Sequence, residues 1–162
     1  MTVMGEISSA IGFDRKDNLC VFYQCVVPEG WEFEDPWYTS HEDFGAFADD
    51  VELNVRESVT QFSTATIKQY GDHMVFVSNF EFPFDYQFLR DMREGKSQAN
   101  PYLIFQVNSQ DSWGRNRIEG YGFLQIPRTE GHHTLKIQTW KPRSDLYAEI
   151  HAFFLGGSIR IP

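Results

Sequence analysis

Three aspartates, Asp14, Asp17 and Asp111, are the side chains best suited to bind a metal ion. Calcium requires several oxygen ligands, which carboxylates on neighbouring loops can supply together. In a common calcium-binding pattern, Asp-x-Asp is followed further along the chain by a third acidic residue. Ser109 stands at the first position of that pattern, Asp111 at the second and Arg117 at the third. Because two ligands are missing, we expect no calcium site and no cofactor, and read the three aspartates as solvated turn residues.

Basic and aromatic side chains cluster around the same stretch. Arg115, Arg117, Lys141 and Arg143 could contact anionic lipid, at about 1 kcal/mol each near a charged surface. Trp113 lies in the same turn. These five residues are our candidates for contact with a membrane or a protein partner, although solvated strand ends explain the charges equally well.

Catalytic signatures are absent from the sequence. It contains no Gly-x-Ser-x-Gly elbow, no phosphate-binding loop and no His-Glu-x-x-His motif. Gly120-Tyr-Gly122 lacks the third glycine of a dinucleotide site, so we expect these glycines to make room for a large neighbour within a strand. His132 and His133 are adjacent, and adjacent side chains diverge in extended chain, which disfavours a shared metal. The sequence predicts a protein that is not an enzyme.

The formal net charge of -9 argues against nucleic-acid binding, which requires clustered Lys and Arg. The charge is unevenly distributed. Residues 29–57 contain many acids and a single basic residue, Arg56, whereas residues 115–143 are mainly basic. Opposite ends of the fold are thus expected to carry opposite fields, which suits docking between charged partners, although solvation of a long loop explains the acidic run as well.

Cys20 and Cys25 lie in one expected strand on opposite faces, so they cannot bridge each other. Their spacing matches no zinc or redox motif, which favours a reducing, cytoplasmic compartment. The N-terminal residues lack the basic and apolar regions of a signal peptide, and no apolar run is long enough to span a bilayer. Any membrane contact is therefore expected to be peripheral.

Alternation of apolar and polar residues predicts the elements that position these side chains. The predicted strands cover 5–13, 19–27, 58–67, 74–88, 102–108, 118–126 and 134–140. Pro83 should mark an edge, bend or bulge in the long strand 74–88. Ser144 could cap a helix that runs to Leu155 and stops at Gly156.

Residues 29–55 are the least regular part of the chain. We expect a long acidic and aromatic insertion there, with a short helical turn near 44–48. The whole pattern predicts one domain, residues 1–162, that folds as an all-β antiparallel sandwich of seven to eight strands with one short C-terminal helix.

Several phrases resemble the B9 domain family, whose fold is similar to that of C2 domains. They are Val107-Asn-Ser-Gln-Asp-Ser-Trp-Gly-Arg-Asn-Arg-Ile-Glu-Gly-Tyr-Gly-Phe, Pro127, Gly131-His-His-Thr-Leu and Thr139-Trp-Lys-Pro. Further phrases are similar to the Meckel syndrome type 1 branch of the family: Gly5-Glu-Ile, Asp17-Asn-Leu, Val59-Thr-Gln, Phe80-Glu-Phe-Pro-Phe and Phe153-Phe-Leu-Gly-Gly-Ser. The resemblance extends nearly from end to end.

The resemblance implies a scaffold of the ciliary transition zone, near the basal body, within the Meckel complex. Its implied partners are other B9-domain proteins and transition-zone membrane proteins, and it implies no catalytic residue. The alternative is a peripheral lipid-, calcium- or carbohydrate-binding module that uses the three aspartates or the aromatic residues Trp31 and Trp37.

Overall fold

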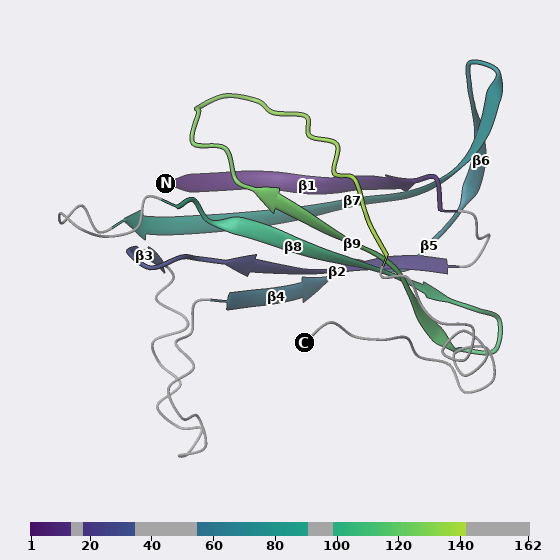
Figure 1. Ribbon diagram of the computed structural model, residues 1–162, viewed down its shortest axis with the longest axis horizontal. Coiled ribbons are helices and arrows are strands. Elements are labelled where there is room, and N and C mark those ends of the chain that lie inside the picture. Colours follow the sequence, from purple (N-terminus) through teal and green to yellow (C-terminus); the bar gives the residue numbers. More distant parts are fainter. Residues whose placement is uncertain (14–17, 35–54, 91–98, 142–162) are drawn as a thin grey trace, which may run out of the picture.

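The computed structural model describes residues 1–13, 18–34, 55–90 and 99–141, and that part of the chain is entirely β-structure and connecting segments. The strands form two antiparallel sheets (Figure 1). The first sheet has the order β1-β7-β3, with β6 also paired to β7, and its strands are β1 (Thr2–Ile11), β3 (Trp31–Phe33), β6 (Thr66–Tyr70) and β7 (His73–Arg90). The second has the order β4-β2-β8-β9, with β5 also paired to β2, and its strands are β2 (Asn18–Val26), β4 (Val55–Val59), β5 (Ser63–Thr64), β8 (Tyr102–Gln110) and β9 (Asn116–Gln125). The predicted all-β antiparallel sandwich is confirmed, and the described residues form nine strands where seven to eight were expected.

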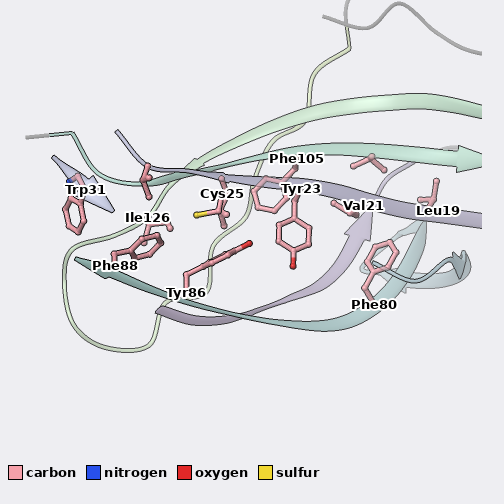
Figure 2. Packing of buried hydrophobic residues seen from close by; sticks show 13 residues of the cluster. Leu19, Val21, Tyr23, Cys25, Trp31, Phe80, Tyr86, Phe88, Phe105 and Ile126 are labelled. Atoms are coloured by element: carbon pink, nitrogen blue, oxygen red, sulfur yellow. The ribbon is translucent and has the colours of Figure 1, made fainter. Parts of the chain in front are cut away.

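The core lies between the two sheets and follows the period-two pattern of the strands. Alternate residues of β2 and β8 are buried and face the aromatic side chains of β7 (Figure 2). Tyr23 of β2 makes an edge contact with Phe82 of β7 at 6.2 Å between ring centroids and stacks with Phe105 of β8 at 6.3 Å. The alternate residues of the expected strand 19–27 form the inward face, since Leu19, Val21, Tyr23, Cys25 and Val27 are all buried.

A bulge interrupts β7 close to Pro83. Ile7 is paired with Phe82 but Ser9 with Asn79, so β7 has one more residue than β1 over this interval. Glu81 adopts a positive φ of 48° within the bulge, a conformation that glycine adopts more readily than other residues. The expected irregularity is thus present, and it lies two residues before the proline.

The predicted strand 58–67 is wrong as one element. It is divided among β4, β5 and β6, the first two in one sheet and β6 in the other. Thr60 accounts for the break, because its Oγ1 accepts a hydrogen bond from Val21 N at 2.9 Å while its own N–H donates to Val21 O at 2.9 Å. The Thr60 hydroxyl thereby accepts the hydrogen bond that a backbone carbonyl of a continuing strand would otherwise accept.

The predicted strand 134–140 is also wrong except at its end. Only Trp140 pairs, through a bridge to Tyr121, and residues 133–139 are irregular. Ile137 instead packs against the core.

The expected insertion 29–55 is corrected at both of its ends. Trp31–Phe33 form β3, which pairs with the end of β7, and Val55 begins β4. The helical turn near 44–48 and the C-terminal helix at 144–155 lie outside the described residues. The assignment of one domain to residues 1–162 remains a prediction.

Candidate interaction site at the β8–β9 turn

The turn between β8 and β9 carries most of the side chains that the sequence singled out. β8 and β9 pair from Tyr102↔Gln125 to Gln110↔Asn116, so Ser109 and Arg117 stand opposite each other at the base of the turn. Residues 111–115 form the turn itself, and Gly114 adopts a φ of 77°, which glycine tolerates without steric cost. We call Ser109, Asp111, Trp113, Arg115, Arg117, Glu119 and Lys141 the turn cluster.

Asp111 is held by donors from its own turn. Its Oδ1 accepts hydrogen bonds from the backbone N–H of Trp113 and of Arg115, both at 3.0 Å. Its Oδ2 accepts a hydrogen bond from Arg115 Nε at 2.8 Å and lies 3.6 Å from a guanidinium nitrogen of Arg117. Both carboxylate oxygens therefore shape the turn.

These contacts lower the pKa of Asp111 below its ordinary value. The hydrogen bond from the Arg115 backbone is the largest cause, and the Arg115 side chain, the Trp113 backbone and the charge of Arg115 act in the same direction. Each of these groups stabilises the ionised carboxylate in preference to the neutral acid. Asp111 thus carries its negative charge throughout the physiological pH range.

Ser109 has a similar internal role. Its hydroxyl is buried and donates to Glu119 Oε1 at 2.6 Å, and Lys141 Nζ lies 3.4 Å from Glu119 Oε2. The residue at the first position of the calcium pattern is therefore a donor to a carboxylate, the reverse of a metal ligand's role. Glu119 was not among the residues expected from the sequence, although its position two residues after Arg117 in an alternating strand indicates the same face.

Trp113 is the exposed member of the turn cluster. Its side chain is 81% exposed, and the Arg115 guanidinium lies 5.1 Å from the centroid of its ring. Arg115 and Arg117 are less accessible, at 25% and 15% of their side-chain surface, because both lean toward Asp111. The turn therefore presents an aromatic surface whose nearby cations are partly neutralised by Asp111.

The other metal candidates do not converge in the part of the chain that the structure covers. No group of three or more His, Cys, Asp or Glu side chains in that part could hold an ion. His132 and His133 are exposed, and His133 Nε2 lies 2.8 Å from Thr129 O. Asp14, Asp17 and Arg143 lie outside the described residues.

Two further expectations from the sequence have clear outcomes. Trp31 is wrong as an exposed carbohydrate-binding residue, because it is 5% exposed in the core and its indole N–H donates to Ala99 O at 2.9 Å. Trp37 lies outside the described residues. Gly120 and Gly122 do make room for neighbours, since an added Cβ would lie 3.1 Å from Thr139 Cβ and 3.0 Å from Ile137 Cγ2, respectively.

The two cysteines are free, as expected from their spacing, and both are buried. Burial raises the pKa of the Cys25 thiol to about 12, against a smaller opposing effect of Arg56. Burial also raises the pKa of Cys20. Within the described residues, no helix has the length and apolar composition of a membrane span.

Comparison with known proteins assigns this arrangement to a family. Residues 1–161 match the family described as ciliary basal body-associated, B9 protein. The chain is 34% identical over 163 residues to the human tectonic-like complex member MKS1 and 33% identical over 161 residues to the mouse protein, covering 98% of this chain and 25% of each relative. It is 36% identical over 155 residues to the bovine B9 domain-containing protein 2, covering 96% of this chain and 71% of that protein.

The chain thus spans about a quarter of the length of the MKS1 relatives. No solved structure gives a significant match. The resemblance drawn from the phrases around the β8–β9 turn is confirmed, because the family match covers almost every residue. This chain, a two-sheet antiparallel sandwich with a self-paired turn between β8 and β9, belongs to the B9 domain family.

Proposed function

We propose that the chain is a non-enzymatic scaffold that assembles with other B9-domain proteins at the ciliary base, in the Meckel complex of the transition zone. The observation that carries this proposal is the end-to-end match to a family described as ciliary basal body-associated. Similarity to both MKS1 and B9 domain-containing protein 2 makes other B9-domain proteins the first partners to test.

The turn cluster fits a role in binding more than a role in chemistry. Of its carboxylates, Asp111 accepts a hydrogen bond from Arg115. Glu119 accepts one from Ser109 and forms an ion pair with Lys141. An acid or base in catalysis needs access to a substrate proton, whereas these groups hold the shape of a protruding turn. This arrangement leaves the Trp113 side chain exposed. Aromatic side chains of this kind are frequent anchors of protein interfaces.

The calcium-dependent alternative conflicts with the geometry at Asp111. A metal ion would have to displace two backbone donors and two guanidinium groups from the same carboxylate. Titration calorimetry with calcium should therefore give no binding heat in the micromolar range. Binding in that range would restore the ligand-binding alternative.

The scaffold proposal is tested by locating the protein in a ciliated cell. We expect a fluorescently tagged chain to concentrate between the basal body and the ciliary shaft, where it overlaps a transition-zone marker. An unlinked fluorescent protein is the control. Uniform cytoplasmic fluorescence at expression levels matched to that control would contradict the proposal.

A second candidate is peripheral contact with anionic lipid, favoured by the position of Trp113 beside Arg115. Tryptophan prefers the boundary between water and lipid. Co-sedimentation with vesicles of phosphatidylcholine containing phosphatidylserine tests this function, and phosphatidylcholine vesicles provide the comparison. Binding that needs phosphatidylserine and is lost in Trp113→Ala would support it, and equal sedimentation of the two proteins would oppose it.

A further inference from the structure

The β6–β7 hairpin projects beyond the rest of the first sheet. It consists of β6 and the first residues of β7, joined at Gly71 and Asp72, and Figure 1 shows it extending away from the two sheets. Every residue from Thr66 to Met74 is exposed, and Val75 and Phe76 are half-buried. The core between the sheets therefore does not reach the tip of this hairpin.

One face of the hairpin is apolar. Ile67 pairs with Phe76 and Gln69 pairs with Met74, so these four side chains share a face. On β7 the alternation through Phe76 and Met74 continues that of the core residue Phe80. The core-facing side of the sheet thus extends past its cover, leaving Ile67 53% and Met74 67% exposed.

The backbone of β6 is also open on one side. Within the described residues β6 pairs with β7 alone, and from residue 73 to residue 75 the strand β7 pairs with β6 alone, while Phe76 O also accepts a hydrogen bond from Gly12 N at 3.0 Å. An isolated two-stranded ribbon is marginally stable in water, and a third strand or a covering element makes it stable. Among the residues that the structure describes, no strand pairs with the outer edge of β6, so its backbone donors and acceptors there can bind such a strand.

The chemistry of the hairpin favours a protein over a membrane. Its apolar face contains no ionisable side chain, and the turn at its tip carries Asp72. A carboxylate at the leading point would be repelled by anionic lipid and would be costly to insert into apolar lipid. A strand that is apolar on one face meets both requirements, because it pairs with the β6 backbone and places its apolar side chains beside Ile67, on the same face of the sheet as Met74 and Phe76.

We propose that the β6–β7 hairpin is a docking arm that accepts a strand from a partner protein along the outer edge of β6. This inference rests on the proposed function, since the partner is taken to be another B9-domain protein. It is independent of the turn cluster, which lies between β8 and β9 in the other sheet.

The test uses the full chain and B9 domain-containing protein 2 of the same organism, with affinity measured by calorimetry. The double variant Ile67→Thr, Met74→Thr removes the apolar face while keeping side chains that favour strands. Its matched control is Lys68→Thr, Tyr70→Thr, on the opposite face of the same strand, where Tyr70 is 54% exposed. We expect the first variant to raise Kd about tenfold or more and the control to change it about twofold or less.

Hydrogen exchange provides the second measurement. Partner binding should slow exchange in a peptide that covers residues 66–77, because a new strand protects the amides of β6. Circular dichroism and thermal unfolding confirm that both variants remain folded.

The outcomes separate the two proposals. If the unmodified chain does not bind the partner, the proposed function fails. If it binds but the face variant binds equally well, or if exchange is slowed only outside the hairpin, the docking arm alone is refuted.

Discussion

At the residue scale, Asp111 shows how a position within a metal-binding pattern can serve another purpose. A single carboxylate accepts two backbone N–H groups and contacts two guanidinium groups. Arg117 stands where the calcium pattern has an acid, and its cation takes the place of the metal's positive charge near Asp111. The sequence shows this exchange of charge, but only the folded structure shows that Trp113 is the exposed side chain.

Asp111→Asn should loosen the turn, because an amide cannot accept the same charged contacts. The folded-state pKa of Asp111 is lowered, so its stabilising effect is present above the unfolded pKa and is lost as pH falls through the folded pKa. We therefore expect the variant to unfold more readily than the native chain at neutral pH, with the difference shrinking on acidification. Thermal unfolding measured from pH 7 down to about pH 3 provides the data.

Asp85→Asn is the control for this experiment. Asp85 is exposed on β7, so this substitution removes the same charge far from the turn. A difference between Asp111→Asn and the native chain that stays constant with pH would show that the carboxylate contacts contribute nothing to stability.

At the element scale, the long strand β7 combines a bulge with the densest aromatic face of the core. The bulge around Glu81 lets β7 keep Phe82, Phe84, Tyr86 and Phe88 against the opposite sheet while it continues into the projecting hairpin. Bulges sharpen local twist and redirect a strand. The direction of the β6–β7 hairpin therefore depends on this irregularity.

Glu81→Gly should stabilise the protein by about 0.5–1 kcal/mol, because glycine adopts a positive φ without the steric cost that glutamate bears. Asp85→Gly, in the regular part of the same strand, should destabilise it by a similar amount. Urea unfolding of the two variants measures both changes in the free energy of unfolding. A loss of stability in both would mean that the Glu81 side chain contributes more than its backbone strain costs.

Gly122→Val should displace the segment that packs over β9. A Cβ added at this position would lie 3.0 Å from Ile137 Cγ2, so the larger side chain must move Ile137 and Thr139. We expect a loss of about 1–3 kcal/mol and faster hydrogen exchange at Tyr121 and Trp140, whose bridge lies beside the clash.

The double variant Gly122→Val, Ile137→Ala provides the control, because the smaller residue 137 makes room for the valine. The double variant should lose less unfolding free energy than the sum of the losses in the two single variants. If the two losses simply add, contact between residue 122 and Ile137 is not the cause of the destabilisation.

Much of the fold could be predicted from local pattern, and the failures have physical causes. The inward face of β2 follows from strict alternation, and the β8–β9 pair follows from two apolar runs around a polar turn. The break at Thr60 could not be predicted, because it depends on a side-chain hydrogen bond to Val21, distant in sequence. The segment 134–140 alternates like a strand, yet the space above Gly120 and Gly122 draws Ile137 into the core instead.

For the candidate site, the sequence located the turn but not its internal pairing. Residue types alone identified Asp111, Arg115, Arg117 and Trp113. Whether a cation is free or bound to a neighbouring carboxylate depends on distances that a sequence does not contain. The exposure of the apolar face of the β6–β7 hairpin could not be predicted either, because its alternation is the same as that of core strands.

At the scale of the whole molecule, the sandwich has two features that extend from it. One is the turn cluster of the second sheet, with Trp113 exposed, and the other is the hairpin of the first sheet, with Ile67 and Met74 exposed. The buried aromatic core between the sheets provides a rigid base for both. The proposed scaffold needs more than one contact surface, and these two features, on separate sheets, are our candidates for them.

The central claim is that this B9 domain assembles with other members of its family. Its most direct test is co-expression of the chain with B9 domain-containing protein 2 of the same organism, followed by size-exclusion chromatography with light scattering. We expect one peak that contains both chains and has the summed mass of a heteromer. Two separate peaks, each with the mass of a single chain, would contradict it.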